Sequence, residues 1–178
     1  RRDAQCFDLV GQGCAAALPN WRLAKALLAE REARHVLTIC VEVSSAAMYL
    51  DNDPGVLISA CLFGDGAGAS VMSCEPRPDR RAVEFTTARS LVNPDQREAL
   101  RFETRGGMLR NVLTRPVPQL AGGHAREVLD AALEEARIAQ SDISAWILHA
   151  GGRDVLKALR DRLDQEQPGP PGSRFRRG

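Results

Sequence analysis

The chain has 178 residues, of which 44% are apolar and 26% charged, and its formal net charge is +1. This length and apolar content suffice for the core of one sizeable domain or of parts of two. The near-neutral charge argues neither for a nucleic-acid-binding protein nor for an acidic one, and no apolar run is long enough for a membrane-spanning helix.

Two glycines lead directly into a cysteine in the sequence Val-Gly-Gln-Gly-Cys-Ala-Ala-Ala-Leu-Pro, residues 10–19. Apolar side chains spaced four apart follow, which predicts a helix over about residues 15–31. Cys14 would stand at the first turn of this helix, where the helix dipole favours a thiolate nucleophile. Cys14 is therefore a candidate nucleophile, although the local sequence fits a buried small residue equally well.

Five cysteines are spread along the chain without any Cys-x-x-Cys pair: Cys6, Cys14, Cys40, Cys61 and Cys74. Their odd number favours free thiols in a reducing cytoplasm over a disulfide framework. Cys40 and Cys61 lie in apolar runs that we expect to be buried strands. The three histidines show no metal-ligand spacing with the cysteines, so we expect no metal site. No secretory signal is visible at the start, and we expect a cytoplasmic protein.

The first half of the sequence is rich in apolar runs. Residues 35–43 predict a central strand buried on both faces, and residues 56–63 predict a second strand. The second run leads into Gly-Asp-Gly-Ala-Gly at 64–68, where glycines allow close approach of the backbone to a ligand or a neighbouring segment. A further strand is expected over 68–73. The small residues from Ser44 to Met48 could line a cavity.

The second half alternates between strand and helix signals. A strand is expected over residues 82–92 and an amphipathic helix over 124–140. A buried strand over 145–149 would end at His149, directly before a glycine turn. Another helix is expected over 153–163.

Cys14, the Phe-Gly-Asp-Gly-Ala-Gly turn that begins at Phe63, and the His-Ala-Gly-Gly segment that begins at His149 form an ordered set. With strands and helices alternating between them, they resemble the thiolase superfamily, and within it the chalcone-synthase-like type III polyketide synthases. The resemblance extends from about residue 8 to 163. Its matching blocks are residues 11–16, 40–47, 60–69 and 146–152.

The resemblance implies an α/β, thiolase-like layered αβαβα fold that is incomplete in this chain. Enzymes of the family have two similar halves. Residues 1–76 would be the C-terminal part of the first half with the nucleophilic cysteine, and residues 77–163 the N-terminal part of the second half with the catalytic histidine. Residues 164–178 are rich in Pro, Gly and Arg and would form a disordered tail.

The resemblance also implies residue roles. Cys14 would be the acyl nucleophile, His149 would pair with it, and Phe63 would gate the passage between the CoA tunnel and the acyl cavity. Asn111 falls near the second gate aromatic of plant enzymes, where it would widen or polarise the cavity. The implied substrate-binding residues are Phe63, Gly64, Ser44, Ala47, Asn111, Gly151 and Gly152.

The implied reaction joins a starter acyl-CoA to malonyl-CoA by decarboxylative Claisen chemistry through an acyl-enzyme on Cys14. The products would be polyketides such as pyrones, resorcinols or chalcone-like compounds. CoA thioesters are the substrates, and no metal or redox cofactor is implied. The full-length parent protein would be a homodimer. The family's catalytic asparagine segment has no counterpart in this chain, so we expect impaired condensation.

Two alternatives stay open. A fatty-acid-type 3-ketoacyl synthase III shares the fold, the cysteine and the glycine turn, but its histidine motif is typically His-Gln-Ala-Asn rather than the His-Ala-Gly-Gly found here at 149–152. A non-catalytic remnant of the fold would explain the missing asparagine segment. In either case we expect neither a nucleic-acid partner nor a membrane span.

Overall fold

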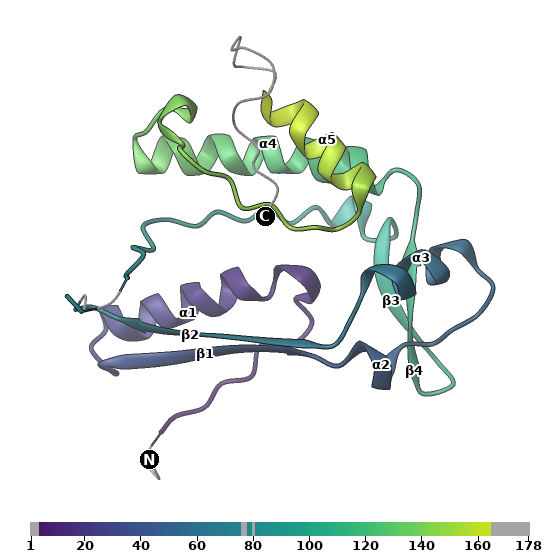
Figure 1. Ribbon diagram of the computed structural model, residues 1–178, viewed down its shortest axis with the longest axis horizontal. Coiled ribbons are helices and arrows are strands. Elements are labelled where there is room, and N and C mark those ends of the chain that lie inside the picture. The colour runs from purple at the N-terminus through teal and green to yellow at the C-terminus, as the bar shows by residue number, and fades with distance from the viewer. Residues whose placement is uncertain (1–3, 76–77, 80, 165–178) are drawn as a thin grey trace. The chain divides into compact units, whose positions relative to one another are not determined.

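The computed structural model describes residues 4–75, 78–79 and 81–164 (Figure 1). The chain divides into two compact units, the first formed by residues 1–43 and 65–88 and the second by residues 44–64 and 89–178. The units interleave along the sequence, and the domain boundary predicted between residues 76 and 77 stays a prediction. The tail predicted over 164–178 lies, apart from its first residue, outside the described residues.

The first unit is a helix on a two-stranded hairpin. Strand β1 (His35–Glu42) pairs antiparallel with β2 (Gly66–Ser73), with His35 opposite Ser73 and Glu42 opposite Gly66. Helix α1 (Ala17–Ala29) runs along one face of this hairpin (Figure 1). The helix predicted over 15–31 and the strands predicted over 35–43 and 68–73 are therefore confirmed, and every predicted end lies within two residues of the observed one.

Only one face of the β1–β2 hairpin is covered within the described part of the chain. On the covered side, Ala24 and Leu28 of α1 and Thr38 of β1 are buried. On the other side, Leu37, Ile39 and Val41 are 54–64% exposed, as strand alternation requires. The prediction that this strand is buried on both faces is wrong for this chain, because a single helix can cover only one side of a sheet.

The segment after β2 is held against α1 by side chains. The Trp21 indole donates a hydrogen bond to Ser70 Oγ at 3.0 Å and packs edge-on against Phe85, with ring centroids 5.7 Å apart. Lys25 Nζ donates to the carbonyl oxygen of Thr86 at 2.5 Å. The strand predicted over 82–92 is wrong: this segment has no strand partner among the described residues and is fixed by contacts with a helix instead.

The second unit combines helices with a second hairpin. Its helices are α2 (Ser44–Ala47), α3 (Pro54–Leu62), α4 (Val117–Ala136) and α5 (Arg153–Asp164), and its strands are β3 (Leu100–Arg105) and β4 (Met108–Leu113). Helix α3 packs on β4, and α4 packs against α5 (Figure 1). Gly122 of α4 allows this close approach, because a Cβ added there would lie 3.0 Å from the carbonyl oxygen of Ala158.

Residues 56–63, predicted as a strand, form most of α3. Asp53 explains the difference: its side chain caps the helix by accepting hydrogen bonds from the backbone N–H groups of Gly55 (2.9 Å) and Val56 (3.2 Å), and Pro54 occupies the first turn. Cys61 consequently lies in a helix and is exposed, which corrects its predicted place in a buried strand.

The last elements follow the prediction in part. Helix α5 confirms the helix predicted over 153–163, and α4 begins seven residues earlier and ends four residues earlier than the predicted 124–140. The strand predicted over 145–149 is wrong, because this run has no strand to pair with among the described residues.

Candidate active site

Cys14 lies in a tight turn just ahead of α1. Gly13–Ala15 form one 3-10 turn, and α1 begins three residues after the cysteine. Gly11 and Gly13 have φ angles of +78° and +51°, a backbone conformation that favours glycine. Cys14 is exposed, which argues against its alternative interpretation as a buried small residue. The glycine turn therefore presents the thiol at the N-terminal end of a helix.

His149 lies in an equally compact turn in the second unit. The backbone N–H of Gly151 donates to the carbonyl oxygen of His149 at 3.0 Å. A Cβ added at Gly151 would lie 3.3 Å from Cδ2 and 3.5 Å from Nε2 of His149. The imidazole thus folds back over the Gly151 backbone, and a side chain at that position would crowd the ring.

Phe63 lies at the C-terminal end of α3. Its backbone N–H donates to the carbonyl oxygen of Ser59 at 2.9 Å, and its ring faces Phe102 of β3 with centroids 6.4 Å apart. The preceding residue, Leu62, reaches the histidine turn: a Cβ added at Gly152 would lie 3.6 Å from Leu62 Cδ1. The structure therefore brings the Phe63 end of α3 and the His149 turn together within the second unit. The predicted convergence of Cys14 on them stays a prediction.

The remaining predicted substrate-binding residues vary in exposure. Ser44 of α2 is buried, Ala47 is half-buried, and Gly64 is exposed directly after Phe63. Gly151 and Gly152 are half-buried in the histidine turn. These roles in substrate binding stay predictions.

Asn111 of β4 is tied to α3. Its side chain is nearly fully buried, and Nδ2 donates to Ser59 Oγ at 2.5 Å. Ser59 Oγ in turn donates to the carbonyl oxygen of Gly55 at 2.7 Å. The structure therefore gives Asn111 a contact with α3, and its assignment to the substrate cavity stays a prediction.

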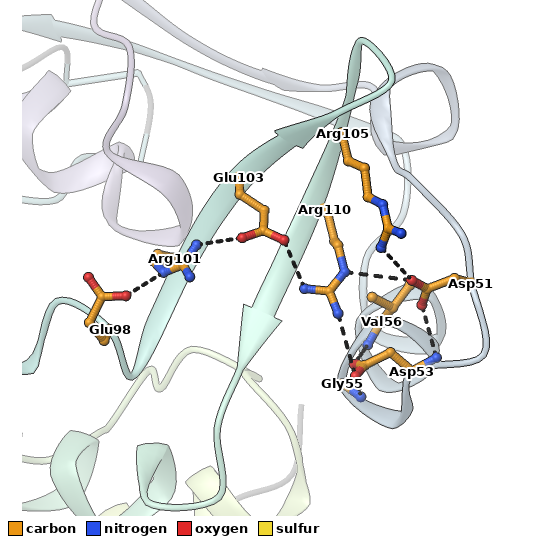
Figure 2. Close-up of polar contacts among 9 residues, drawn as sticks. All are labelled: Asp51, Asp53, Gly55, Val56, Glu98, Arg101, Glu103, Arg105 and Arg110. Carbon is orange, nitrogen blue, oxygen red and sulfur yellow. Dashed lines mark hydrogen bonds and ion pairs between the residues drawn. The ribbon is translucent and has the colours of Figure 1, made fainter.

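Figure 2 shows a chain of ion pairs that sequence reasoning missed. The Arg110 guanidinium lies 3.0 Å from Glu103, 3.4 Å from Asp53 and 3.6 Å from Asp51. Arg101 extends the chain by contacting Glu103 at 2.9 Å and Glu98 at 2.7 Å. The alternating Arg and Glu residues at 98–105 are the feature of the sequence from which these ion pairs could have been predicted.

These ion pairs have an electrostatic consequence. The hydrogen bond from Arg101, helped by a second from Arg110, lowers the pKa of Glu103 below its ordinary value of 4.5. They also connect β4 to the residues that begin α3, because Asp53 is the cap of that helix. The network therefore fixes one end of α3 against the β3–β4 hairpin.

Within the described residues, no cluster of three or more His, Cys, Asp or Glu side chains is arranged to hold a metal ion. Across the same part of the chain, no helix combines the length and apolar character needed to cross a membrane.

Solved structures identify the class of fold. The C-terminal type III polyketide synthase domain of Steely1, a type I/III hybrid from Dictyostelium, matches with a TM-score of 0.76 and 23% identity over 92% of this chain and 47% of that chain. PKS-I from the brown alga Ectocarpus siliculosus matches with a TM-score of 0.73 and 22% identity over 84% of this chain and 40% of its own. The predicted thiolase-like α/β fold is thereby confirmed, with only part of it present here.

The sequence comparisons identify the family. The model of the FAE1/type III polyketide synthase-like proteins matches residues 1–92, just over half of the chain. The chain belongs to this family. It is also 30% identical over 158 residues to the 3,5-dihydroxyphenylacetyl-CoA synthase of Streptomyces toyocaensis, over 85% of this chain and 40% of that protein. The chain thus spans about two-fifths of the length of this curated relative.

Proposed function

We propose that this chain carries the acyl nucleophile of a type III polyketide synthase and that this nucleophile is Cys14. The observation that carries the proposal is the exposed position of Cys14 in a glycine turn ahead of α1, inside the residues that the family model matches. The family match also favours the polyketide branch over a fatty-acid-type 3-ketoacyl synthase III.

The proposed chemistry balances without a metal or redox cofactor. The Cys14 thiolate attacks the thioester carbonyl of a starter acyl-CoA, forms a new thioester and releases CoA thiolate. Malonyl-CoA then loses CO₂ and leaves an enolate. The enolate carbon attacks the acyl group on Cys14, and the cysteine leaves as a thiolate while the chain grows by two carbons. Starter acyl-CoA and malonyl-CoA are therefore the proposed substrates.

His149 would donate a hydrogen bond to the developing enolate oxygen. His149 is exposed, and its ring lies over the Gly151 backbone. The second donor would come from the asparagine that the resemblance implies and that this sequence lacks. Because loss of one such donor costs about 10²–10³-fold in rate, we expect this chain alone to accept an acyl group weakly and to condense poorly. The homodimer and the cytoplasmic location of the parent protein are part of the same proposal.

The experiment is acyl-enzyme formation by the full 178-residue chain. The chain is incubated with a radiolabelled acyl-CoA starter, and the labelled peptide is mapped. Label on the peptide containing Cys14, retained in Cys6→Ala and absent in Cys14→Ala, is the expected result. Label that persists in Cys14→Ala contradicts the nucleophile assignment.

Addition of malonyl-CoA tests condensation separately. We expect little CO₂ release and little product, and robust product formation by this chain alone would show that the missing segment is dispensable. No acyl label and no product would instead favour a non-catalytic remnant of the fold.

A further inference from the structure

The contact between α3 and β4 is built around polar side chains. Val56, Asn111 and Ser59 are the largest of the fully buried side chains among the described residues, at 0%, 2% and 1% exposure. Two of the three are therefore polar, at the position where α3 packs on the hairpin. A buried polar pair in such a place specifies one arrangement of the two elements, because only one registry satisfies its hydrogen bond.

Asn111 is poorly suited to stabilising the fold on its own. Its Nδ2 is satisfied by Ser59, but its Oδ1 is buried and has no hydrogen-bond partner among the described residues. A buried carbonyl without a partner costs free energy that an apolar side chain of the same size would not. The unpartnered Oδ1 of Asn111 therefore offsets part of the stability that its hydrogen bond to Ser59 contributes. This points to a role in placing α3 on β4 rather than in stabilising the fold.

Helix α3 connects this hydrogen bond to the candidate site. Ser59 lies four residues before Phe63, and its carbonyl oxygen accepts the backbone N–H of Phe63 at 2.9 Å. Leu62, in the same turn, lies beside Gly152 of the histidine turn. A rotation or shift of α3 at Ser59 would consequently move both the Phe63 ring and the surface against which the His149 turn rests.

We propose that Asn111 and Ser59 are a positioning pair: their hydrogen bond sets the registry of α3 on β4 and thereby fixes the Phe63 ring at the candidate site. The proposal rests on the proposed function only in treating Phe63 as the gate to the acyl cavity. In this assignment Asn111 acts through α3 and does not touch the substrate.

The test places 4-fluorophenylalanine at Phe63 alone in the 178-residue chain and records its ¹⁹F NMR signal without substrate. Ser59→Ala and Asn111→Leu each remove the hydrogen bond, and each is expected to shift or broaden the fluorine signal. The double variant is expected to give a smaller change than the sum of the two single variants, because both single variants remove the same hydrogen bond. Asn111→Leu is expected to leave the unfolding midpoint unchanged or raised, because it also removes the unpartnered oxygen.

Thr114→Val is the matched control. Thr114 follows β4 and donates through Oγ1 to the carbonyl oxygen of Ala99 at 2.7 Å, so its loss removes a comparable hydrogen bond that does not reach α3. Its fluorine signal should match that of the parent chain. The proposal is overturned if the Asn111 and Ser59 variants leave the Phe63 signal unchanged, or if Thr114→Val shifts it equally. Ser59→Ala keeps the test decisive if Asn111→Leu does not fold.

A second measurement tests whether the Asn111–Ser59 pair affects which starter acyl-CoA the chain accepts. Acyl transfer to the chain is compared for a short and a long starter acyl-CoA. We expect the ratio of the two rates to change by about tenfold in Asn111→Leu and not in Thr114→Val, because a displacement of about 1 Å can cost up to about 10²-fold in rate. An altered fluorine signal with no acyl transfer in any variant would uphold the positioning pair and count against the proposed function alone. An altered signal with an unchanged rate ratio would overturn the link to substrate choice.

Discussion

The contacts inside the first unit differ in kind from the contacts inside the second unit. In the first unit, α1 covers one face of the β1–β2 hairpin with small and aliphatic side chains, of which Ala24 and Leu28 are buried. In the second unit, α3 meets β4 through the Asn111–Ser59 hydrogen bond and the ion pairs of Arg110, which Figure 2 shows. Apolar burial stabilises a packing without fixing its details, whereas paired polar groups allow few arrangements.

This difference suits what each unit presents. The first unit needs to present one thiol, and a glycine turn ahead of a packed helix is sufficient for that. The second unit brings an aromatic ring and an imidazole from segments more than 80 residues apart into neighbouring turns. Directional contacts can hold such a pair in place, while the first unit combines buried apolar side chains with the hydrogen bond from Trp21 to Ser70.

The largest expected effect comes from breaking apolar burial in the first unit. Leu28→Ala should lower the free energy of unfolding by about 2–3 kcal/mol, since Leu28 is 6% exposed between α1 and the hairpin. Leu37→Ala, on the open face at 60% exposure, should change it by less than about 0.5 kcal/mol. Urea unfolding followed by Trp21 fluorescence in a Trp146→Phe background measures both. Equal losses would show that the open face is covered in solution.

The next largest expected effect is a difference in alkylation rate between two exposed thiols, one from each unit. Cys14 precedes the N-terminal end of α1, whereas Cys61 lies in the last turn of α3. A helix dipole favours an anion at the first place and disfavours it at the second, by about 0.3–1 kcal/mol each. Brief iodoacetamide treatment and peptide mapping should therefore show Cys14 reacting up to about thirtyfold faster than Cys61. Faster labelling of Cys61 would reject the candidate nucleophile.

A smaller effect concerns the histidine turn. Gly151→Ala should displace the His149 ring by a few tenths of an ångström, because the added Cβ would lie 3.3 Å from His149 Cδ2. The ¹H–¹³C NMR signal of His149 Cδ2 should shift, with the free energy of unfolding changed by about 0.5 kcal/mol or less. Gly123→Ala is the control, since a Cβ there meets nothing within 4 Å. An unmoved signal would show that the ring does not rest on Gly151 in solution.

The sequence predicted best the elements whose signals are local. Helix α1, helix α5 and strands β1 and β2 follow from periodicity and β-branched runs. The strand prediction over residues 56–63 fails because Asp53-Pro54-Gly55 is typical of a turn but also begins helices, and here Asp53 caps α3. The predicted start of α4 is late because the polar, glycine-containing residues before 124 give mixed local signals, whereas the structure uses Gly122 for the close packing on α5.

The strands predicted over 82–92 and 145–149 show a different limit. Both runs have strand composition, but a strand needs a partner, and neither has one among the described residues. For the site, sequence motifs marked Cys14, Phe63 and His149. The partners of Asn111 could not be foreseen, because Ser59 is 52 residues away and nothing local in the sequence connects the two.

The smallest expected effect is the pH dependence of the ion pairs in the second unit. The pKa of Glu103 is lower in the folded chain than its ordinary value of 4.5, chiefly through the hydrogen bond from Arg101. A lowered carboxyl pKa contributes stability that is fully present above the ordinary value and is lost as the pH falls through the folded value. Glu103→Gln should therefore be slightly less stable than the parent chain near neutral pH, and the difference should vanish under acid conditions. Urea unfolding at several pH values measures it, with Glu127→Gln, exposed on α4, as the control. A stability difference that persists unchanged at a pH well below the lowered pKa of Glu103 would mean that the charge of Glu103 does not account for its contribution to stability.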